Sequence, residues 1–349
     1  MKRIAFITKK RNDAVRIVEE NLLRELKKEN SNHFKIDIII FPYVNSLYSF
    51  LYLFKNLKMI ISIYREYDII HYSSFDIYII IFQPILKLIY RKKTLLTIYH
   101  LEIDFINYVL SKLGLYERIL KSFDSYICIS EYSKSQLIEI KINKSKIHVA
   151  RLGVDEKYFY PDSNKNNFQQ YILFVGDEYP RKNLSTFLSG FKQITIEYPE
   201  LRLIKIGEVK DISHKIITDK LINDLDLYGN VKFKRNKLSL SALRKYYSNA
   251  FFLVSPSTLE GFGLPVAEAM RCKCIPLVSK IPAYEEFNLP KSLYVENTLG
   301  KDQWVKKMKF LLSLEKEQKK ELQELLYKKS LDYSWKKMAT QVGTVYSSL

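Results

Sequence analysis

A regular alternation of short apolar runs and longer amphipathic segments is the feature of this sequence that most constrains its fold. The apolar runs are rich in Ile, Val, Phe and Tyr and are almost continuously hydrophobic, as strands buried on both faces of a sheet are. Segment 13–29, by contrast, has apolar residues at helical spacing. In the first half of the chain the runs cover residues 3–8, 35–41, 68–73, 94–99, 125–130 and 146–152. The alternation predicts βαβ units that form a parallel sheet.

A second series of apolar runs follows a polar, turn-rich stretch and predicts a second domain. The stretch begins near Gly153 and includes Pro161. The runs beyond it cover residues 171–176, 201–207, 230–235, 250–256, 274–279 and 292–297. We therefore expect an α/β fold of two Rossmann-like, doubly wound parallel-sheet domains that face each other across a cleft. The expected parts are an N-terminal domain over 1–158, a C-terminal domain over 159–330, and a C-terminal helix over 331–349 that packs back toward the N-terminal domain.

The chain is strongly basic, which indicates an anionic partner. Lysine and arginine number 56 against 38 acidic residues, so the formal net charge is +18 at pH 7. A nucleotide diphosphate, an acidic lipid surface or nucleic acid would suit this charge, and the alternative is that the lysines serve solubility alone. The sequence lacks the interleaved basic and aromatic motifs of nucleic-acid-binding domains, so we expect no nucleic-acid partner.

The cysteines and the apolar runs together predict a cytoplasmic protein. Cys128, Cys272 and Cys274 have neither the spacing of a disulfide framework nor a histidine cluster that would complete a zinc site, which is typical of a reducing compartment. The N-terminal segment lacks the long apolar region and the cleavage site of a signal peptide. The most apolar run, residues 77–90, is too short to span a bilayer and contains a proline and a lysine.

Residues 255–270, SPSTLEGFGLPVAEAM, combine two acidic residues with a glycine turn and a helix start. Glu260 follows an apolar run, and Glu268 lies about one turn inside a helix that Pro265 is suited to begin. Gly263 lets the backbone approach a ligand closely, and the N–H groups at the helix start form an anion site. Carboxylates accept hydrogen bonds from hydroxyls. The stretch therefore predicts a site for a ligand that carries both hydroxyls and phosphate, a nucleotide sugar.

A set of motifs in the same order resembles those of the retaining glycosyltransferases of family 4, which have the GT-B fold. EGFGLPVAEAM resembles the E-x7-E motif of that family, and ILFVGDEYPRKNL resembles its VG…KN phosphate segment. CISEYSK, IHVARLGVDEKYFYP and NVKFKRNKLSLSALRKYYSNA resemble further family segments. The likeness extends over nearly the whole chain and is greatest between residues 147 and 278.

The resemblance implies how the donor is recognised. Glu268 would bind the ribose of the donor nucleotide, and Glu260 would contact the hydroxyls of the transferred sugar. The backbone of Phe262, Gly263 and Leu264 would hold the sugar and the diphosphate.

The resemblance also implies how the negative charge of the diphosphate is neutralised. Lys182 matches the family lysine with this role. Relatives often have an arginine directly after the glycine at the end of the VG strand, but here Gly176 is followed by Asp177, and Arg181 is expected to supply the missing charge. The alternative for Arg181 and Lys182 is a solvated helix entry. His100, which follows an N-terminal strand, is expected near the transferred sugar, with a structural role as the alternative.

The expected activity is transfer of a hexose from a nucleotide-diphosphate sugar to a hydroxyl of a saccharide or lipid-linked saccharide, with the anomeric configuration retained. The expected setting is the biosynthesis of cell-surface polysaccharide or lipopolysaccharide. The PRKN and EGFGLPVAEAM segments resemble those of mannosyl-type members, so GDP-mannose is the first expected donor and a UDP-hexose the second. We expect a metal-independent reaction, in which cationic side chains and helix N–H groups take the place of a metal ion. The alternative is a catalytically silent subunit that binds a nucleotide sugar.

Basic and aromatic segments of the N-terminal domain suggest an anionic membrane as a partner. Residues 45–67 mix aromatic residues with Lys55, Lys58 and Arg65, and basic residues occupy positions 91–93. Such segments suit a peripheral position at the inner face of the cell membrane and a lipid-linked acceptor. The alternative is an ordinary core-facing helix whose lysines lie in solvent.

Overall fold

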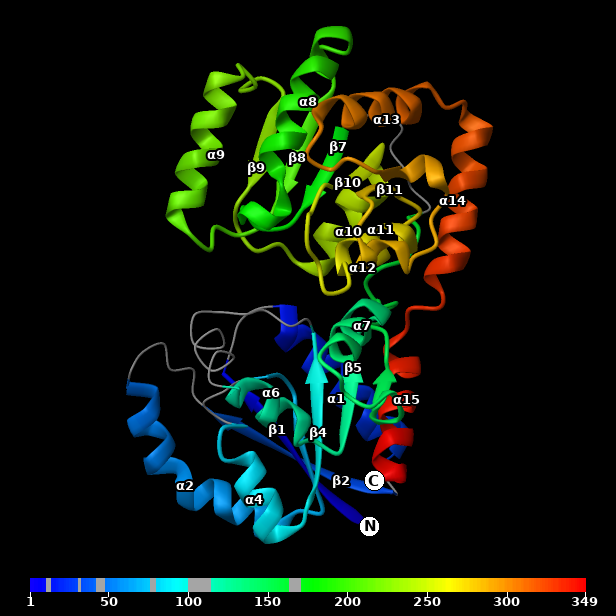
Figure 1. Cartoon of the computed structure of the whole chain (residues 1–349). Helices are drawn as coiled ribbons and strands as arrows, with labels where there is room; N and C mark the ends of the chain where they lie inside the picture. Colours follow the sequence, from blue (N-terminus) through cyan, green and yellow to red (C-terminus); the bar gives the residue numbers. More distant parts are fainter. Residues whose placement is uncertain (11–13, 31–32, 42–47, 76–79, 100–113, 163–170) are drawn as a thin grey trace. The chain divides into compact units, whose positions relative to one another are not determined.

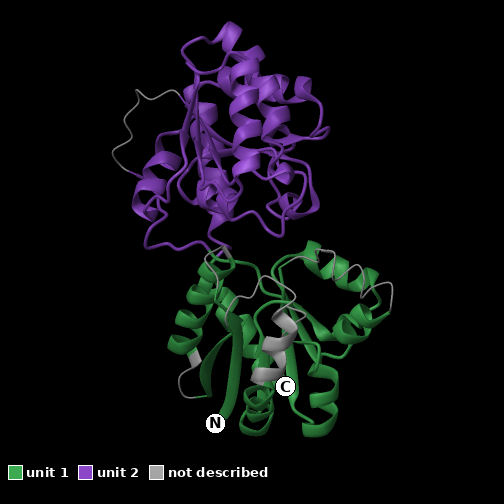
Figure 2. Cartoon of the chain, turned by 90° about the vertical axis from the view of Figure 1, so that its left-hand side faces the viewer, with its two compact units in different colours: residues 1–153, 334–349 green, residues 154–333 purple. Residues whose placement is uncertain are grey.

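The chain forms two compact units, each built on one parallel sheet. The computed structural model describes residues 1–10, 14–30, 33–41, 48–75, 80–99, 114–162 and 171–349 (Figure 1). The first unit comprises Met1–Gly153 together with Ser334–Leu349, and the second comprises Val154–Tyr333 (Figure 2). Within these described residues, no helix combines the length and the hydropathy that crossing a bilayer requires.

The sheet of the first unit has six parallel strands in the order β2-β1-β3-β4-β5-β6. The strands are β1 (Lys2–Lys9), β2 (Phe34–Phe41), β3 (Ile69–Tyr72), β4 (Lys93–Ile98), β5 (Ser125–Cys128) and β6 (Ile147–Val149). Ile4 of β1 pairs with Ile36 on one side and with Ile69 on the other. Strands β3 and β5 are buried along their whole length. This burial on both faces is the reason that their sequences are almost continuously apolar.

The helices of the first unit connect these strands, and the last one comes from the far end of the chain. They are α1 (Ala14–Asn30), α2 (Tyr48–Glu66), α4 (Gln83–Tyr90), α6 (Leu115–Lys121), α7 (Glu131–Glu139) and α15 (Trp335–Ser348), with a short 3-10 helix, η1 (Lys144–Lys146). Helix α15 packs against α1. The hydroxyl of Tyr346 in α15 lies 2.6 Å from Nδ1 of His71, and Nε2 of His71 lies 2.8 Å from the Thr97 hydroxyl. The completely buried His71 therefore fastens α15 to the sheet.

The second unit repeats the architecture with strand order β12-β11-β10-β7-β8-β9, again parallel throughout. Its strands are β7 (Tyr171–Val175), β8 (Arg202–Ile206), β9 (Val231–Lys234), β10 (Phe252–Ser255), β11 (Ile275–Ser279) and β12 (Tyr294–Val295). Its helices are η2 (Pro180–Lys182), α8 (Leu184–Glu197), α9 (Ile212–Asp224), α10 (Leu240–Asn249), α11 (Leu264–Arg271), α12 (Pro282–Glu285), η3 (Lys291–Leu293), α13 (Lys301–Ser313) and α14 (Lys316–Ser330). The two doubly wound α/β sheets that the apolar alternation predicts are thus confirmed.

The boundary between the units differs slightly from the one expected after residue 158. The structure assigns residues 154–158 to the second unit, because the N–H of Val154 donates to the carbonyl of Tyr333 at 3.2 Å, inside that unit. Gly153, the last residue of the first segment, lies so close to the start of α15 that an added Cβ would come within 2.1 Å of the Trp335 backbone nitrogen. A glycine is therefore required where the chain leaves the first unit.

Candidate functional site

The candidate site lies in the second unit, at the carboxyl ends of the neighbouring strands β7 and β10. The chain continues from β7 to β8 on one side and from β10 to β11 on the other, so the loops after β7 and β10 part at this edge. Ligands of open α/β sheets bind at such a switch point. The two loops are nevertheless tied together, because the N–H of Thr258 donates to the carbonyl of Arg181 at 2.8 Å.

Glu260 is the centre of a charged cluster formed by these two loops. Its Oε1 accepts from Lys182 Nζ at 2.6 Å and from the Ser257 hydroxyl at 2.7 Å, and its Oε2 accepts from Arg181 at 3.3 Å. The side chains of Glu260 and Lys182 are only 11% and 12% exposed, whereas that of Arg181 is 37% exposed. Burial alone would raise the pKa of Glu260, but the Lys182 ammonium and the Arg181 guanidinium outweigh it and lower that pKa below its usual value. Glu260 is therefore a carboxylate at neutral pH.

The start of α11 provides backbone donors beside this cluster. Gly263 caps the helix with a φ of 103°, and an added Cβ would meet the Tyr284 ring at 2.5 Å, so only glycine fits there. The Phe262 side chain is buried against Phe287 and Tyr333, which leaves only its backbone for a ligand.

The backbone donors at the start of α11 are the N–H groups of Phe262, Gly263 and Leu264. The hydrogen bonds among the described residues give none of them an acceptor. The first N–H groups of a helix have no partner within the helix, and they carry the positive end of its dipole. Together with Arg181 and Lys182, they make this end of α11 suitable for an anion such as a diphosphate.

Glu268 belongs to a separate network, one turn into α11. It accepts a hydrogen bond of 2.8 Å from the hydroxyl of Tyr247, which is completely buried in α10. Burial raises the pKa of Glu268 to about 7, although the Tyr247 hydroxyl opposes this shift. Among the described residues, no hydrogen bond or ion pair connects Glu268 with Glu260. The two glutamates can therefore act on different parts of a ligand.

Gly176 directly follows β7, next to the charged cluster. Its N–H donates to the carbonyl of Ile206 at 2.8 Å, and an added Cβ would lie 3.5 Å from the Lys182 chain. The following residue, Asp177, has a buried Oδ1 without a hydrogen-bond partner among the described residues. Arg181 is the cation nearest to Asp177 in sequence that contacts the cluster.

The structure brings together only some of the residues predicted from the sequence. Lys182, Arg181 and Glu260 form one cluster, and Phe262, Gly263 and Leu264 follow it directly. Glu268 lies in its own network, and His100 lies outside the described residues. In the part of the chain that the structure describes, no three His, Cys, Asp or Glu side chains group as metal ligands would.

Sequence reasoning missed the neutral partners of the two glutamates and a second charged network. Ser257 and Tyr247 give no signal in the sequence, because their partners are decided by packing. Lys205 does give a signal in the sequence, since it interrupts the apolar strand β8. Its ammonium is completely buried and lies 3.1 Å from the Glu178 carboxylate. Glu178 forms a second ion pair with Arg235 at 3.0 Å.

Comparison with known proteins identifies the class to which this fold and site belong. Residues 157–328 match the family of glycosyl transferases group 1, and residues 8–158 match Glycosyltransferase Family 4. The two matches together span both units. The chain therefore belongs to the family 4 glycosyltransferases, as the motifs predict.

Two relatives illustrate the similarity. The O-antigen chain mannosyltransferase RfbU of Salmonella typhimurium (strain LT2) is 32% identical over 154 residues, which are 44% of this chain and 41% of that protein. The uncharacterized glycosyltransferase MJ1178 of Methanocaldococcus jannaschii is 26% identical over 228 residues, which are 65% of this chain and 60% of that protein. The matched regions thus span less than two thirds of the length of these relatives.

Solved structures confirm the GT-B fold. The structure of Anabaena HepE in complex with UDP and glucose superposes with a TM-score of 0.81 and 14% identity, over the whole of both chains. The sucrose-phosphate synthase of Thermosynechococcus elongatus gives a TM-score of 0.81 and 18% identity, over 100% of this chain and 99% of that one. At these identities the similarity shows the fold alone.

Proposed function

We propose that this protein is a retaining hexosyltransferase. It moves a hexose from a nucleotide-diphosphate sugar to a hydroxyl of a saccharide or lipid-linked saccharide, in the synthesis of cell-surface polysaccharide or lipopolysaccharide. The observation that carries the proposal is the cluster of Lys182, Arg181 and Glu260 beside the N–H groups at the start of α11. This cluster combines acceptors for sugar hydroxyls with donors for a diphosphate.

GDP-mannose is the first candidate donor and a UDP-hexose is the second. RfbU, described as an O-antigen chain mannosyltransferase, and WbdA of Escherichia coli, described as a serotype-specific mannosyltransferase, support mannose. The complexes of HepE with UDP and with UDP-glucose support the second candidate. A saccharide acceptor is supported by the same O-antigen relative.

Each residue of the site has its own role in the proposed reaction. Lys182, Arg181 and the N–H groups at the start of α11 stabilise the negative charge that builds up on the departing phosphate. The acceptor hydroxyl attacks the anomeric carbon of the donor sugar from the face that the phosphate leaves, and its proton passes to the departing phosphate oxygen. Glu260 accepts hydrogen bonds from hydroxyls of the transferred sugar. Glu268 accepts from the ribose, and this hydrogen bonding favours its ionised form.

We also propose a cytoplasmic location. Cys128 and Cys272 are buried thiols that form no disulfide among the described residues, which suits a reducing compartment.

The test combines donor binding with turnover. Thermal-shift measurements with GDP-mannose, UDP-glucose and UDP-galactose identify the donor, and product release from that donor is then measured with and without saccharide acceptors. We expect a shift with one donor and slow hydrolysis of it. NMR of the transferred sugar reports whether its configuration is retained. A thermal shift without any hydrolysis or transfer would instead support the catalytically silent subunit.

Replacing Lys182 tests the assignment of the cation. We expect Lys182→Ala to lower kcat by about 100-fold, because one donor to the developing charge is lost. Lys192→Ala is the matched control, since Lys192 lies in the same unit and pairs with the exposed Asp226. Equal turnover in the two variants would contradict the role of Lys182.

A further inference from the structure

Helix α4 of the first unit exposes an apolar face. Ile85, Leu88 and Ile89 are 59%, 79% and 62% exposed, and their spacing places them on one side of the helix. Gln83 and Leu86 occupy the buried side. A surface helix of a globular protein normally turns polar residues to solvent, so this face is suited to a further apolar contact.

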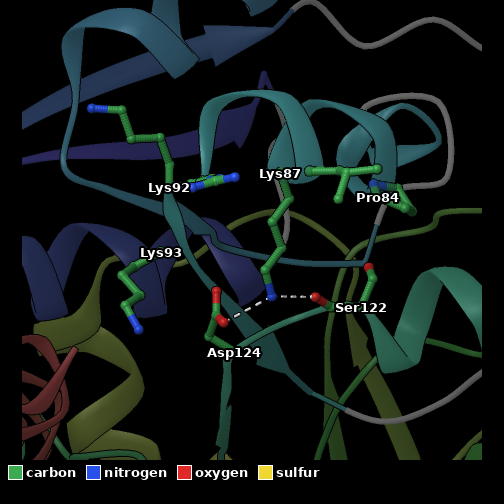
Figure 3. Close-up of a pocket in the computed structure, with 8 residues that line it drawn as sticks. Pro84, Lys87, Lys92, Lys93, Ser122 and Asp124 are labelled. Atoms are coloured by element: carbon green, nitrogen blue, oxygen red, sulfur yellow. Dashed lines mark hydrogen bonds and ion pairs between the residues drawn. The ribbon is translucent and has the colours of Figure 1, made fainter.

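Basic residues surround one end of this apolar face. Arg91 follows the helix in the left-handed conformation, with φ 51°, and Lys92 and Lys93 come next. With Leu88 and Lys87, they line an open hollow of about 420 Å³ (Figure 3). The rim of the apolar face is therefore cationic.

One cation of the hollow is already neutralised, whereas three are not. Lys87 Nζ donates to Asp124 Oδ1 at 2.8 Å and to the Ser122 carbonyl at 2.7 Å, and Figure 3 shows the side chain reaching toward both residues. Arg91, Lys92 and Lys93 form no ion pair with any carboxylate of the described residues. These three charges are available to an external anion.

We propose that the α4 surface, defined as Ile85, Leu88, Ile89 and residues 91–93, docks on a bilayer of anionic phospholipids. The apolar side chains enter the boundary between headgroups and acyl chains, and the three cations lie at the level of the lipid phosphates. This combination of apolar face and cationic rim matches both layers of such a bilayer. The inference concerns binding alone and does not depend on the proposed sugar transfer.

Two observations favour a bilayer over a second copy of the chain. The chain carries a net charge of +18, and in a symmetric dimer through α4 the two cationic rims would approach each other. The place of the surface in its unit also fits docking. Lys93 begins β4 and Asp124 directly precedes β5, so the hollow lies at the amino ends of these strands. The carboxyl ends, where ligands of such sheets bind, stay free.

Vesicle partitioning of the full chain tests the proposal. Vesicles of phosphatidylcholine alone are compared with vesicles of equal parts phosphatidylcholine and phosphatidylglycerol, and the bound fraction is measured by sedimentation. We expect binding to the anionic vesicles and none to the neutral ones. Absence of binding to the anionic vesicles would overturn the proposal.

Charge variants with a matched control test whether the α4 surface itself binds. R91Q/K92Q/K93Q is expected to weaken partitioning by about 100-fold, since each cation at the lipid surface contributes about fivefold. K316Q/K320Q/K328Q removes the same charge from exposed lysines of α14 and is expected to change partitioning by no more than about threefold. Equal losses in the two variants would show attraction by net charge alone and overturn the proposal.

Apolar variants test the insertion of α4. I85S/I89S is expected to weaken partitioning by about tenfold or more. I216S/I217S on α9 replaces two isoleucines of similar exposure, 61% and 62%, and is expected to leave partitioning unchanged. Thermal melts are used to check that both variants are folded. A dimer in analytical ultracentrifugation that I85S/I89S abolishes, without any vesicle binding by the parent chain, would assign the surface to a second copy instead.

Discussion

The two acidic residues of the α11 region differ at the scale of single residues because their neighbours differ. Two cations hold Glu260 in its ionised form, whereas Glu268 has a hydroxyl partner and a raised pKa. The sequence shows two glutamates of equal chemistry, and packing gives them different protonation behaviour. Each difference leads to a measurable prediction.

The contact between Glu260 and Lys182 is expected to stabilise the protein as a pair. Lys182→Met and Glu260→Gln should each lower the free energy of unfolding by about 1–3 kcal/mol, because each removes the nearest counter-charge of a largely buried partner. The double variant should lose less than the sum of the two. Urea unfolding of all four proteins measures the coupling, and strictly additive losses would contradict it. Lys192→Met, at an exposed pair, should change stability by under about 1 kcal/mol.

Glu268 is expected to make stability depend on pH. Its pKa of about 7 in the folded protein exceeds the value of 4.5 that applies without burial, so the folded protein binds more protons between these pH values. Stability should therefore fall as pH rises from about 4.5 to 7 and then stay level, by on the order of 3 kcal/mol in total. Urea unfolding across this range measures the fall. Glu268→Gln cannot titrate, so the same fall in that variant would assign the effect to other groups.

At the scale of elements, the start of α11 depends on one glycine conformation. The positive φ of Gly263 turns the chain into the helix, and the Tyr284 ring occupies the space that a side chain would need. The N–H groups of the proposed anion site keep their positions only while this turn is intact. The helix start and the site are thus one structural feature.

Gly263→Ala is expected to destabilise the second unit and to weaken donor binding. The added Cβ meets the Tyr284 ring at 2.5 Å and imposes a strained φ, which should lower the free energy of unfolding by about 1–3 kcal/mol. Gly229→Ala is the matched control, because no atom lies within 4 Å of its added Cβ. Thermal melts with and without the donor measure both effects. A Gly263→Ala protein as stable as the control would show that the turn can relax.

At the scale of the whole molecule, the chain leaves the first unit after Gly153 and returns to it at Ser334. The returning helix α15 is fastened by the hydrogen bond between Tyr346 and the buried His71. Burial lowers the pKa of His71 to about 3, so its ring is neutral and can accept or donate one hydrogen bond at each nitrogen. The first unit is therefore completed only when the last residues of the chain are present.

Tyr346→Phe is expected to destabilise the first unit. The change leaves Nδ1 of His71 buried without its partner, which should lower the free energy of unfolding by about 1–3 kcal/mol. Tyr228→Phe is the control, since Tyr228 is 66% exposed and should change stability little. Urea unfolding followed by fluorescence compares the two variants. An equal stability of both would show that the tyrosine hydroxyl does not fasten α15.

The sequence by itself determined the class of fold, the approximate position of each strand and the stretch that begins α11. These features are local, because burial on both faces of a strand and the turn at Gly263 leave their marks in consecutive residues. Only the tertiary structure decided that β7 lies beside β10, and hence that Lys182 meets Glu260 from 78 positions away. It likewise decided that Tyr247 donates a hydrogen bond to Glu268, that Lys205 donates one to Glu178, and that Tyr346 is hydrogen-bonded to His71. The partner of a polar side chain depends on which strands lie next to each other in the sheet. The periodicity of the sequence does not indicate the order of the strands.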